Sequence, residues 1–140
     1  MVNTQEFLLQ FRKALQINQV LLSVGLSAVS SHHLKTSLQQ QQAELDQIEH
    51  DLHLLATRRG IEQPELQPGT RWFLKVHFRQ SLGKQDSSIA QKIFLHHVNG
   101  VTELMRSRNA LEHPEMQMIG IFQKYLDYVT VSGRQLLIYL

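Results

Sequence analysis

The chain has 140 residues, 42% of them hydrophobic and 19% charged, which is the size and composition of a single globular domain and not of a disordered segment. It contains no cysteine, which excludes disulfides, thiolate zinc sites and cysteine nucleophiles. The formal net charge of +2 permits an anionic partner but does not require one.

The first long helix is predicted over residues 4–29, where stripe residues recur in alternating steps of three and four. This spacing is typical of a helix that packs nearly parallel to its neighbours. No apolar run approaches the roughly 20 residues that span a bilayer, so we expect a cytoplasmic protein that does not enter a membrane. The stripe consists of Leu8, Phe11, Leu15, Asn18, Leu22, Gly25 and Val29.

A second long helix is predicted over residues 32–59 from the same spacing. Arg58 and Arg59 suit a helix C-terminus, and Gly60 can adopt the left-handed conformation that follows one. Together with the first helix it forms an antiparallel hairpin, because only a few residues join the two. Its stripe consists of Leu34, Leu38, Gln41, Leu45, Ile48, Leu52 and Leu55.

Prolines and glycines between residues 60 and 69 predict a loop. Thr70 can cap a short helix over residues 70–82, which Gly83 ends. This segment is the connection between the first and the second pair of long helices.

The third long helix is predicted over residues 87–109, with Asp86 or Ser87 as its cap. Its apolar stripe is the least regular of the four, because polar residues and a glycine interrupt it. The stripe residues are Ile89, Ile93, Val101 and Leu104, and the interruptions are His96, His97 and Gly100.

The last helix is predicted over residues 114–140, since Pro114 suits a first helical position and Glu115 the first turn. Its stripe consists of Ile119, Phe122, Leu126, Val129, Gly133, Leu136 and Leu140. Four long helices of matched length predict an all-α fold of one domain, residues 1–140, built as a four-helix up-down bundle with a short extra helix between its second and third helices. The long middle connection permits a ferritin-type crossover, and simple up-down topology stays open.

Several stretches of the chain resemble bacterial ferritin-like proteins of the spore-coat-F-like and related uncharacterised stress-protein families. These stretches are residues 41–49, 54–60, 70–72 and 83–90. The resemblance implies a ferritin-like bundle in a bacterial stress or envelope context. Some ferritin-like relatives carry a two-metal carboxylate centre, whereas many members of these families have no established activity.

The ligands of such a centre are sparse in this chain. A di-iron site in this fold needs a Glu from each of two helices and a Glu-x-x-His pair from each of the other two. The first helix has no acid after Glu6, and neither Glu44 nor Glu49 is followed three residues later by histidine. We therefore expect no metal and no cofactor, with iron, manganese or zinc as the alternative. The remaining candidate ligands are Glu44, Glu49, His96, His97 and Glu103, with His50 and His53 as a surface pair.

Two other polar groups stand out. Asn18, Gln41 and one of the pair His96 and His97 interrupt apolar stripes and predict a buried polar layer that fixes helix register. On the short helix, basic residues at four-residue spacing form a small patch for phosphate or nucleic acid, although three charges would bind only weakly. These residues are Arg71, Lys75 and Arg79.

Helix one and the last helix each carry a second apolar stripe, whereas a monomeric bundle needs one per helix. This surplus predicts a homodimer through the outer faces of these two helices. The alternative is that the short helix, with Trp72 and Phe73, covers one of the stripes. The second stripes consist of Ile17, Val20, Leu21, Val24, Ile121, Tyr128, Val131, Ile138 and Tyr139.

The sequence favours a non-catalytic ferritin-like bundle that serves as a structural or protein-interaction module. Two alternatives stay open. One is a metal-binding ferritin-like protein of the iron or manganese oxidase or storage type, and the other is a stress protein that binds nucleic acid weakly.

Overall fold

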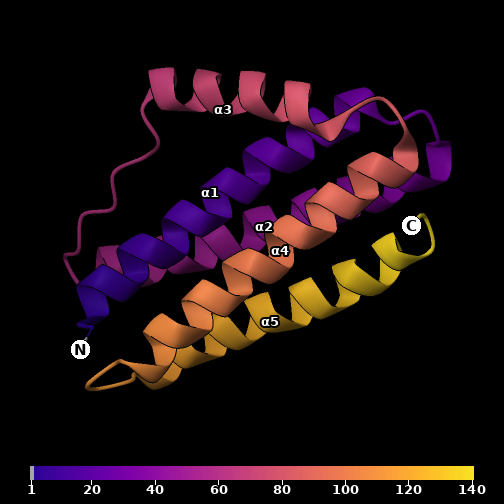
Figure 1. The fold of residues 1–140 in the computed structure, drawn as a ribbon. Coiled ribbons are helices and arrows are strands. Elements are labelled where there is room, and N and C mark those ends of the chain that lie inside the picture. The colour runs from indigo at the N-terminus through magenta and orange to yellow at the C-terminus, as the bar shows by residue number, and fades with distance from the viewer. Residues whose placement is uncertain (1) are drawn as a thin grey trace.

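The chain is all-helical over residues 2–140, the part that the computed structural model describes (Figure 1). The prediction of an all-α fold is confirmed. None of the helices in residues 2–140 has the length and apolar character needed to cross a bilayer. The helices are α1 (Thr4–Ala28), α2 (His32–Arg58), α3 (Pro68–Leu82), α4 (Asp86–Asn109) and α5 (Met116–Leu137).

Each of the four long helices packs against two others. α1 contacts α2 and α4, and α5 contacts the same two helices from the opposite corner. The short helix α3 lies along α1 and touches α4 only near its end. Figure 1 shows that the loop after α2 and helix α3 together carry the chain from the end where α2 finishes to the end where α4 begins. The connection therefore returns the chain to the far end before α4 starts.

Leucines and aromatic rings fill the space between the four long helices. Phe7, Phe11 and Phe122 pack edge to face or tilted, with ring centroids 5.5 to 5.8 Å apart. Tyr125 continues this cluster, since its ring centroid lies 5.4 Å from that of Phe11. Aromatic packing thus joins α1 to α5 through the centre of the bundle.

Three of the predicted helix starts were wrong. α3 begins at Pro68, which occupies the first turn, so Thr70 lies inside the helix and does not cap it. α4 has Gln85 as its cap, and the Asp86 carboxylate instead accepts hydrogen bonds from the backbone N–H groups of Ser30 and Ser31, both at 2.9 Å. α5 begins at Met116, beyond Pro114. Asp86 thereby ties the start of α4 to the turn between α1 and α2.

The predicted stripe of α5 is rotated in the structure. Tyr125 and Tyr128 are buried, whereas Leu126 and Val129 are only partly so and Leu140 is 54% exposed. Tyr128 was expected on the outer face, and that expectation was wrong. The buried residues of α5 also recur at helical spacing, so the sequence carries two overlapping stripes. The buried stripe includes positions 118, 122, 125, 132 and 136. The stripe whose tyrosine hydroxyls find partners faces inward.

The second apolar stripe of α1 is covered by α3. Val20, Leu21 and Val24 are buried, as are Phe78 and Leu82 of α3. Trp72 and Phe73, which were expected to do this covering, are 67% and 63% exposed. This stripe of α1 is therefore buried within a single chain, and it gives no reason to expect a partner chain on that face.

Candidate functional site

A hydrogen-bonded layer of four polar side chains crosses the middle of the bundle, and we call it the tyrosine layer. The Asn18 amide nitrogen of α1 donates to the Tyr125 hydroxyl at 3.2 Å. The Tyr128 hydroxyl and His97 Nε2 form a second hydrogen bond at 3.0 Å. The rings of Tyr125 and Tyr128 stack with centroids 6.1 Å apart and planes at 24°. Three helices, α1, α4 and α5, thus meet through four uncharged groups.

Burial keeps this layer neutral. It raises the pKa of Tyr125 to about 12, and it also raises the pKa of Tyr128. Burial lowers the pKa of His97 to about 4, and the nearby His96 acts in the same direction. Both phenols and the imidazole are therefore uncharged at neutral pH. His97 Nδ1 is buried without a hydrogen-bond partner among residues 2–140.

The predicted buried polar layer is only partly the observed one. Asn18, Gln41 and His97 are buried, whereas His96 lies at the rim of α4 with its ring edge-on to Phe78. Gln41 belongs to a separate contact, in which its amide nitrogen donates to Gln135 Oε1 at 3.1 Å. His97 does not contact Asn18 directly, because the stacked tyrosines lie between them. The sequence analysis missed the two tyrosines because the stripe that it predicted for α5 is not the stripe that faces the core.

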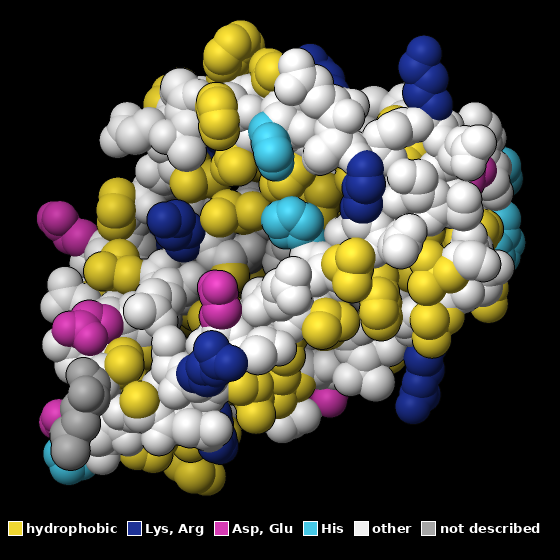
Figure 2. Space-filling model, viewed as in Figure 1, with side chains coloured by type: hydrophobic (Ala, Val, Ile, Leu, Met, Phe, Trp, Pro, Cys, Tyr) yellow, Lys and Arg dark blue, Asp and Glu magenta, His cyan; other side chains and the backbone are white. Residues whose placement is uncertain are grey.

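Beside the tyrosine layer, α1 and α4 separate to leave a groove of about 590 Å³, which we call the α1–α4 groove. Figure 2 shows this hollow on the face of the molecule, with basic, acidic and histidine side chains around it. Asn18 and Gly100 lie at its floor next to the Tyr125 hydroxyl, since a Cβ on Gly100 would stand 3.7 Å from that oxygen. The lining residues are Gln10, Lys13, Ala14, Ile17, Asn18, His96, Asn99, Gly100, Glu103, Leu104 and Ser107.

The groove has a charged group on each wall. Lys13 projects from α1 and Glu103 from α4, and neither forms an ion pair within residues 2–140. His96 stands at the same wall as Glu103, and burial together with the charge of His77 lowers its pKa. The Gln10 and Ser107 side chains hydrogen-bond to one another across one end of the groove.

The candidate metal ligands do not converge. Within residues 2–140, no three side chains of His, Asp or Glu are placed to hold one ion. Glu44 is exposed on α2, Glu49 is engaged by Arg12, and Glu103 lies in the α1–α4 groove. The surface pair, His50 and His53, is exposed on α2. The donor atoms that do meet in the interior are amide, phenol and imidazole groups, not carboxylates.

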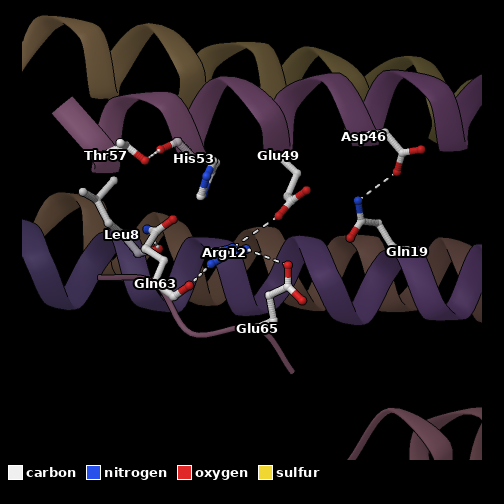
Figure 3. Close-up of polar contacts among 9 residues, drawn as sticks. All are labelled: Leu8, Arg12, Gln19, Asp46, Glu49, His53, Thr57, Gln63 and Glu65. Atoms are coloured by element: carbon white, nitrogen blue, oxygen red, sulfur yellow. Dashed lines mark hydrogen bonds and ion pairs between the residues drawn. The ribbon is translucent and has the colours of Figure 1, made fainter. Parts of the chain in front are cut away.

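Sequence reasoning missed a buried cation, which with its partners we call the Arg12 cluster (Figure 3). The Arg12 side chain is 6% exposed, and its Nε donates to Glu49 Oε1 at 3.2 Å. The guanidinium also donates to the Gln63 backbone carbonyl and lies 3.9 Å from a Glu65 oxygen. Gln63 in turn donates to the Leu8 carbonyl at 3.1 Å. The cluster fastens the loop after α2 onto α1.

The three residues of the predicted anion patch lie along α3. Arg71 and Lys75 are half-buried on α3, and only Arg79 is exposed. The exposed outer side of α3 carries Trp72 and Phe73 instead.

Comparisons of the chain with protein-family models, with curated proteins and with solved structures find no match.

Proposed function

We propose that the chain is a non-catalytic helical bundle that acts as a structural or protein-interaction module, with its long helices in the chain order of ferritin-like bundles. The path of α3 supports this order. Because α3 returns the chain along α1, α2 and α4 run in the same direction at opposite corners, and every neighbouring pair of long helices is antiparallel (Figure 1). One long crossover of this kind is the connection that ferritin-like bundles use.

The tyrosine layer is the observation that carries the proposal. A two-metal centre in such a bundle requires carboxylates from all four helices at one level of the core. At the mid-level of this core, Asn18 hydrogen-bonds to Tyr125 and Tyr128 hydrogen-bonds to His97, and the two tyrosine rings stack. These two hydrogen bonds satisfy both phenol oxygens, which would otherwise be costly to bury, and this stabilises a particular register of the helices. The chemistry of this layer suits structure better than redox catalysis.

Metal loading tests the proposal against the oxidase alternative. The purified protein is incubated with Fe(II) or Mn(II), desalted and analysed for bound metal, and oxygen consumption is followed during iron addition. We expect well under one ion per chain and no oxygen uptake above buffer. A His50→Ala, His53→Ala variant removes the exposed pair, so that metal held only there is recognised. One or more ions per chain retained by this variant, with oxygen uptake, would contradict the proposal.

A second copy of the chain is the partner that we propose for the module. α5 and its C-cap residue Ile138 keep apolar side chains exposed, since Val131, Leu137 and Ile138 are 44%, 53% and 69% exposed. Contiguous exposed apolar side chains are a usual mark of an interface. We expect a solution mass near twice the 16.2 kDa of one chain.

The variant Val131→Glu, Ile138→Glu should reduce this mass to that of a monomer. Leu95→Glu serves as the control, because Leu95 is comparably exposed but lies on α4. A monomeric wild-type protein, measured by light scattering at high micromolar concentration, would contradict the dimer.

A further inference from the structure

The α1–α4 groove has the size and shape of a small-molecule site. Its volume of about 590 Å³ lies within the range of about 300 to 1,000 Å³ that ligand pockets occupy. Each wall is one helix stripe: positions 10, 13, 14 and 17 of α1 face positions 96, 99, 100, 103 and 107 of α4. The site is therefore formed by rigid helices and not by loops.

Gly100 is the residue that keeps the floor open. A Cβ at Gly25 would lie 3.0 Å from Ile93, and one at Gly133 would lie 3.2 Å from Phe94, so these two glycines serve close helix packing. A Cβ at Gly100 would stand in ordinary contact, 3.7 Å from the Tyr125 hydroxyl. Packing does not require glycine there, although glycine inside a helix costs about 0.5 to 1 kcal/mol relative to alanine. What the absence of a side chain at Gly100 provides is open space in the groove, next to the buried Tyr125 side chain.

The floor offers hydrogen bonds to a ligand. Tyr125 accepts from Asn18, and its raised pKa keeps the phenol proton in place at neutral pH. Within residues 2–140, no group accepts that proton in a hydrogen bond, nor does any donate to the Asn18 carbonyl oxygen. Asn18 lines the groove and can thus accept a hydrogen bond from a ligand, whereas the buried Tyr125 holds Asn18 from behind.

We propose that the α1–α4 groove binds a small zwitterion, an α-amino acid with an apolar side chain. Lys13 on one wall pairs with the ligand carboxylate, and Glu103 on the other pairs with its ammonium group. Ala14, Ile17 and Leu104 provide the apolar part of the lining. Opposite charges that are unpaired in the same groove match a ligand that carries both charges better than an anion or a cation alone.

Calorimetry with L-leucine as the probe tests the proposal on the full chain. Two analogues of the probe each lack one charge: 4-methylpentanoate lacks the ammonium group and isopentylamine lacks the carboxylate. We expect leucine to bind with a dissociation constant in the micromolar to millimolar range and each analogue to bind at least tenfold more weakly. Equal binding of either analogue would overturn the zwitterion, and absence of leucine binding at millimolar concentration would overturn the site for this probe class.

Variants place the binding in the groove. Lys13→Met and Glu103→Gln should each weaken leucine binding at least tenfold. Gly100→Leu fills the floor and should abolish binding, whereas Gly120→Leu is the matched control, because Gly120 is also inside a helix and has open space around it. If Gly100→Leu lowers the melting temperature more than the control does, Gly100→Val takes its place. Binding that survives all the groove variants would overturn the proposal, independently of the metal and mass measurements above.

Discussion

The bundle buries polar groups in two regions that follow opposite rules. The Arg12 cluster buries a full charge, and it does so near a surface loop where two carboxylates and a backbone carbonyl surround the guanidinium. The tyrosine layer lies deeper and contains only groups that burial keeps neutral. A charge is costly to bury unless it is paired and hydrogen-bonded, whereas neutral groups need only one another. The comparison shows that a charged group is buried in this fold near the surface, where charged and polar partners surround it, and that the polar groups of the core are neutral.

The largest expected effect is a dependence of stability on pH that comes from the tyrosine layer. The pKa of His97 is about 4 in the folded chain and near 6.5 when unfolded, so the unfolded chain binds more protons between these values. Stability contributed by neutral His97 is complete above pH 6.5 and is lost as pH falls toward 4, by about 3 kcal/mol. Urea unfolding at pH 7, 5.5 and 4 measures this loss.

His97→Gln is the control for the pH dependence. It removes the titrating ring but keeps a hydrogen-bonding side chain beside Tyr128, so its free energy of unfolding should fall much less over the same pH range. His96, whose pKa is also lowered, remains in both proteins and sets the background. Identical pH profiles for the wild type and His97→Gln would show that the layer does not titrate in this way.

The next largest effect is the loss of stability that we expect when the Arg12 cluster is disrupted. Arg12→Met keeps much of the aliphatic length but leaves the Gln63 carbonyl and Glu49 without their donor. We expect a loss of about 2 kcal/mol, below the range for fully buried pairs, because Glu49 can still reach water. Proteolysis within residues 60–67 should also become faster, since the loop is released from α1. Lys13→Met, the neighbouring exposed cation, should change stability by no more than about 0.5 kcal/mol.

If Arg12→Met and Lys13→Met are equally stable, the cluster does not hold the loop. The same two variants also sharpen the comparison with the layer. Because Arg12→Met leaves His97 and its surroundings unchanged, the Arg12→Met protein should keep the wild-type loss of stability between pH 7 and pH 4.

A smaller effect is expected from one hydroxyl of the layer. Tyr125→Phe keeps the ring among the phenylalanines but leaves the buried Asn18 amide without its acceptor. This should cost about 1 kcal/mol. Tyr139→Phe is the matched control, since the Tyr139 hydroxyl contacts the exposed His33 and its loss should have little effect. Thermal unfolding of both variants decides between a buried and a superficial role, and equal melting temperatures would contradict the former.

The smallest effect is expected from an exposed hydrogen bond, which we compare with the buried ones. Gln19 donates to Asp46 at 2.8 Å across α1 and α2, at an exposed position (Figure 3). A double-mutant cycle of Gln19→Ala and Asp46→Ala should give a coupling energy of about 0.5 kcal/mol or less, because water competes for both groups. A coupling above that of Asn18 with Tyr125 would reverse the ranking of buried and exposed contacts.

The helices were predictable because a stripe of apolar residues at steps of three and four depends only on local sequence. Gly60 also adopts the expected positive φ, at 67°, and Gly83 ends α3 as predicted, with a φ of 75°. The helix starts were less predictable, because Asp86 has the composition of a cap but bonds to a turn 55 residues earlier. The choice between two overlapping stripes of α5 depends on hydrogen bonds to other helices, which periodicity does not report.

The site was harder to predict than the fold. His97 could be placed near the interior from its position in α4, but its partner is Tyr128 and not Asn18. Arg12 has its partner Glu49 37 residues away and a loop carbonyl 51 residues away. Arg12 and Lys13 are adjacent in sequence yet differ by about 100° around the helix, so one enters a cluster and the other faces the α1–α4 groove.

The protonation of His97 tests most directly whether the core of this bundle is a neutral structural layer. Ring nitrogen chemical shifts of labelled histidine, followed by NMR from pH 7.5 downward, report that protonation in the folded chain. A neutral imidazole that persists until pH approaches about 4 is the predicted result. A midpoint near 6.5, the ordinary value for histidine, would mean that the ring is hydrated and would contradict the account.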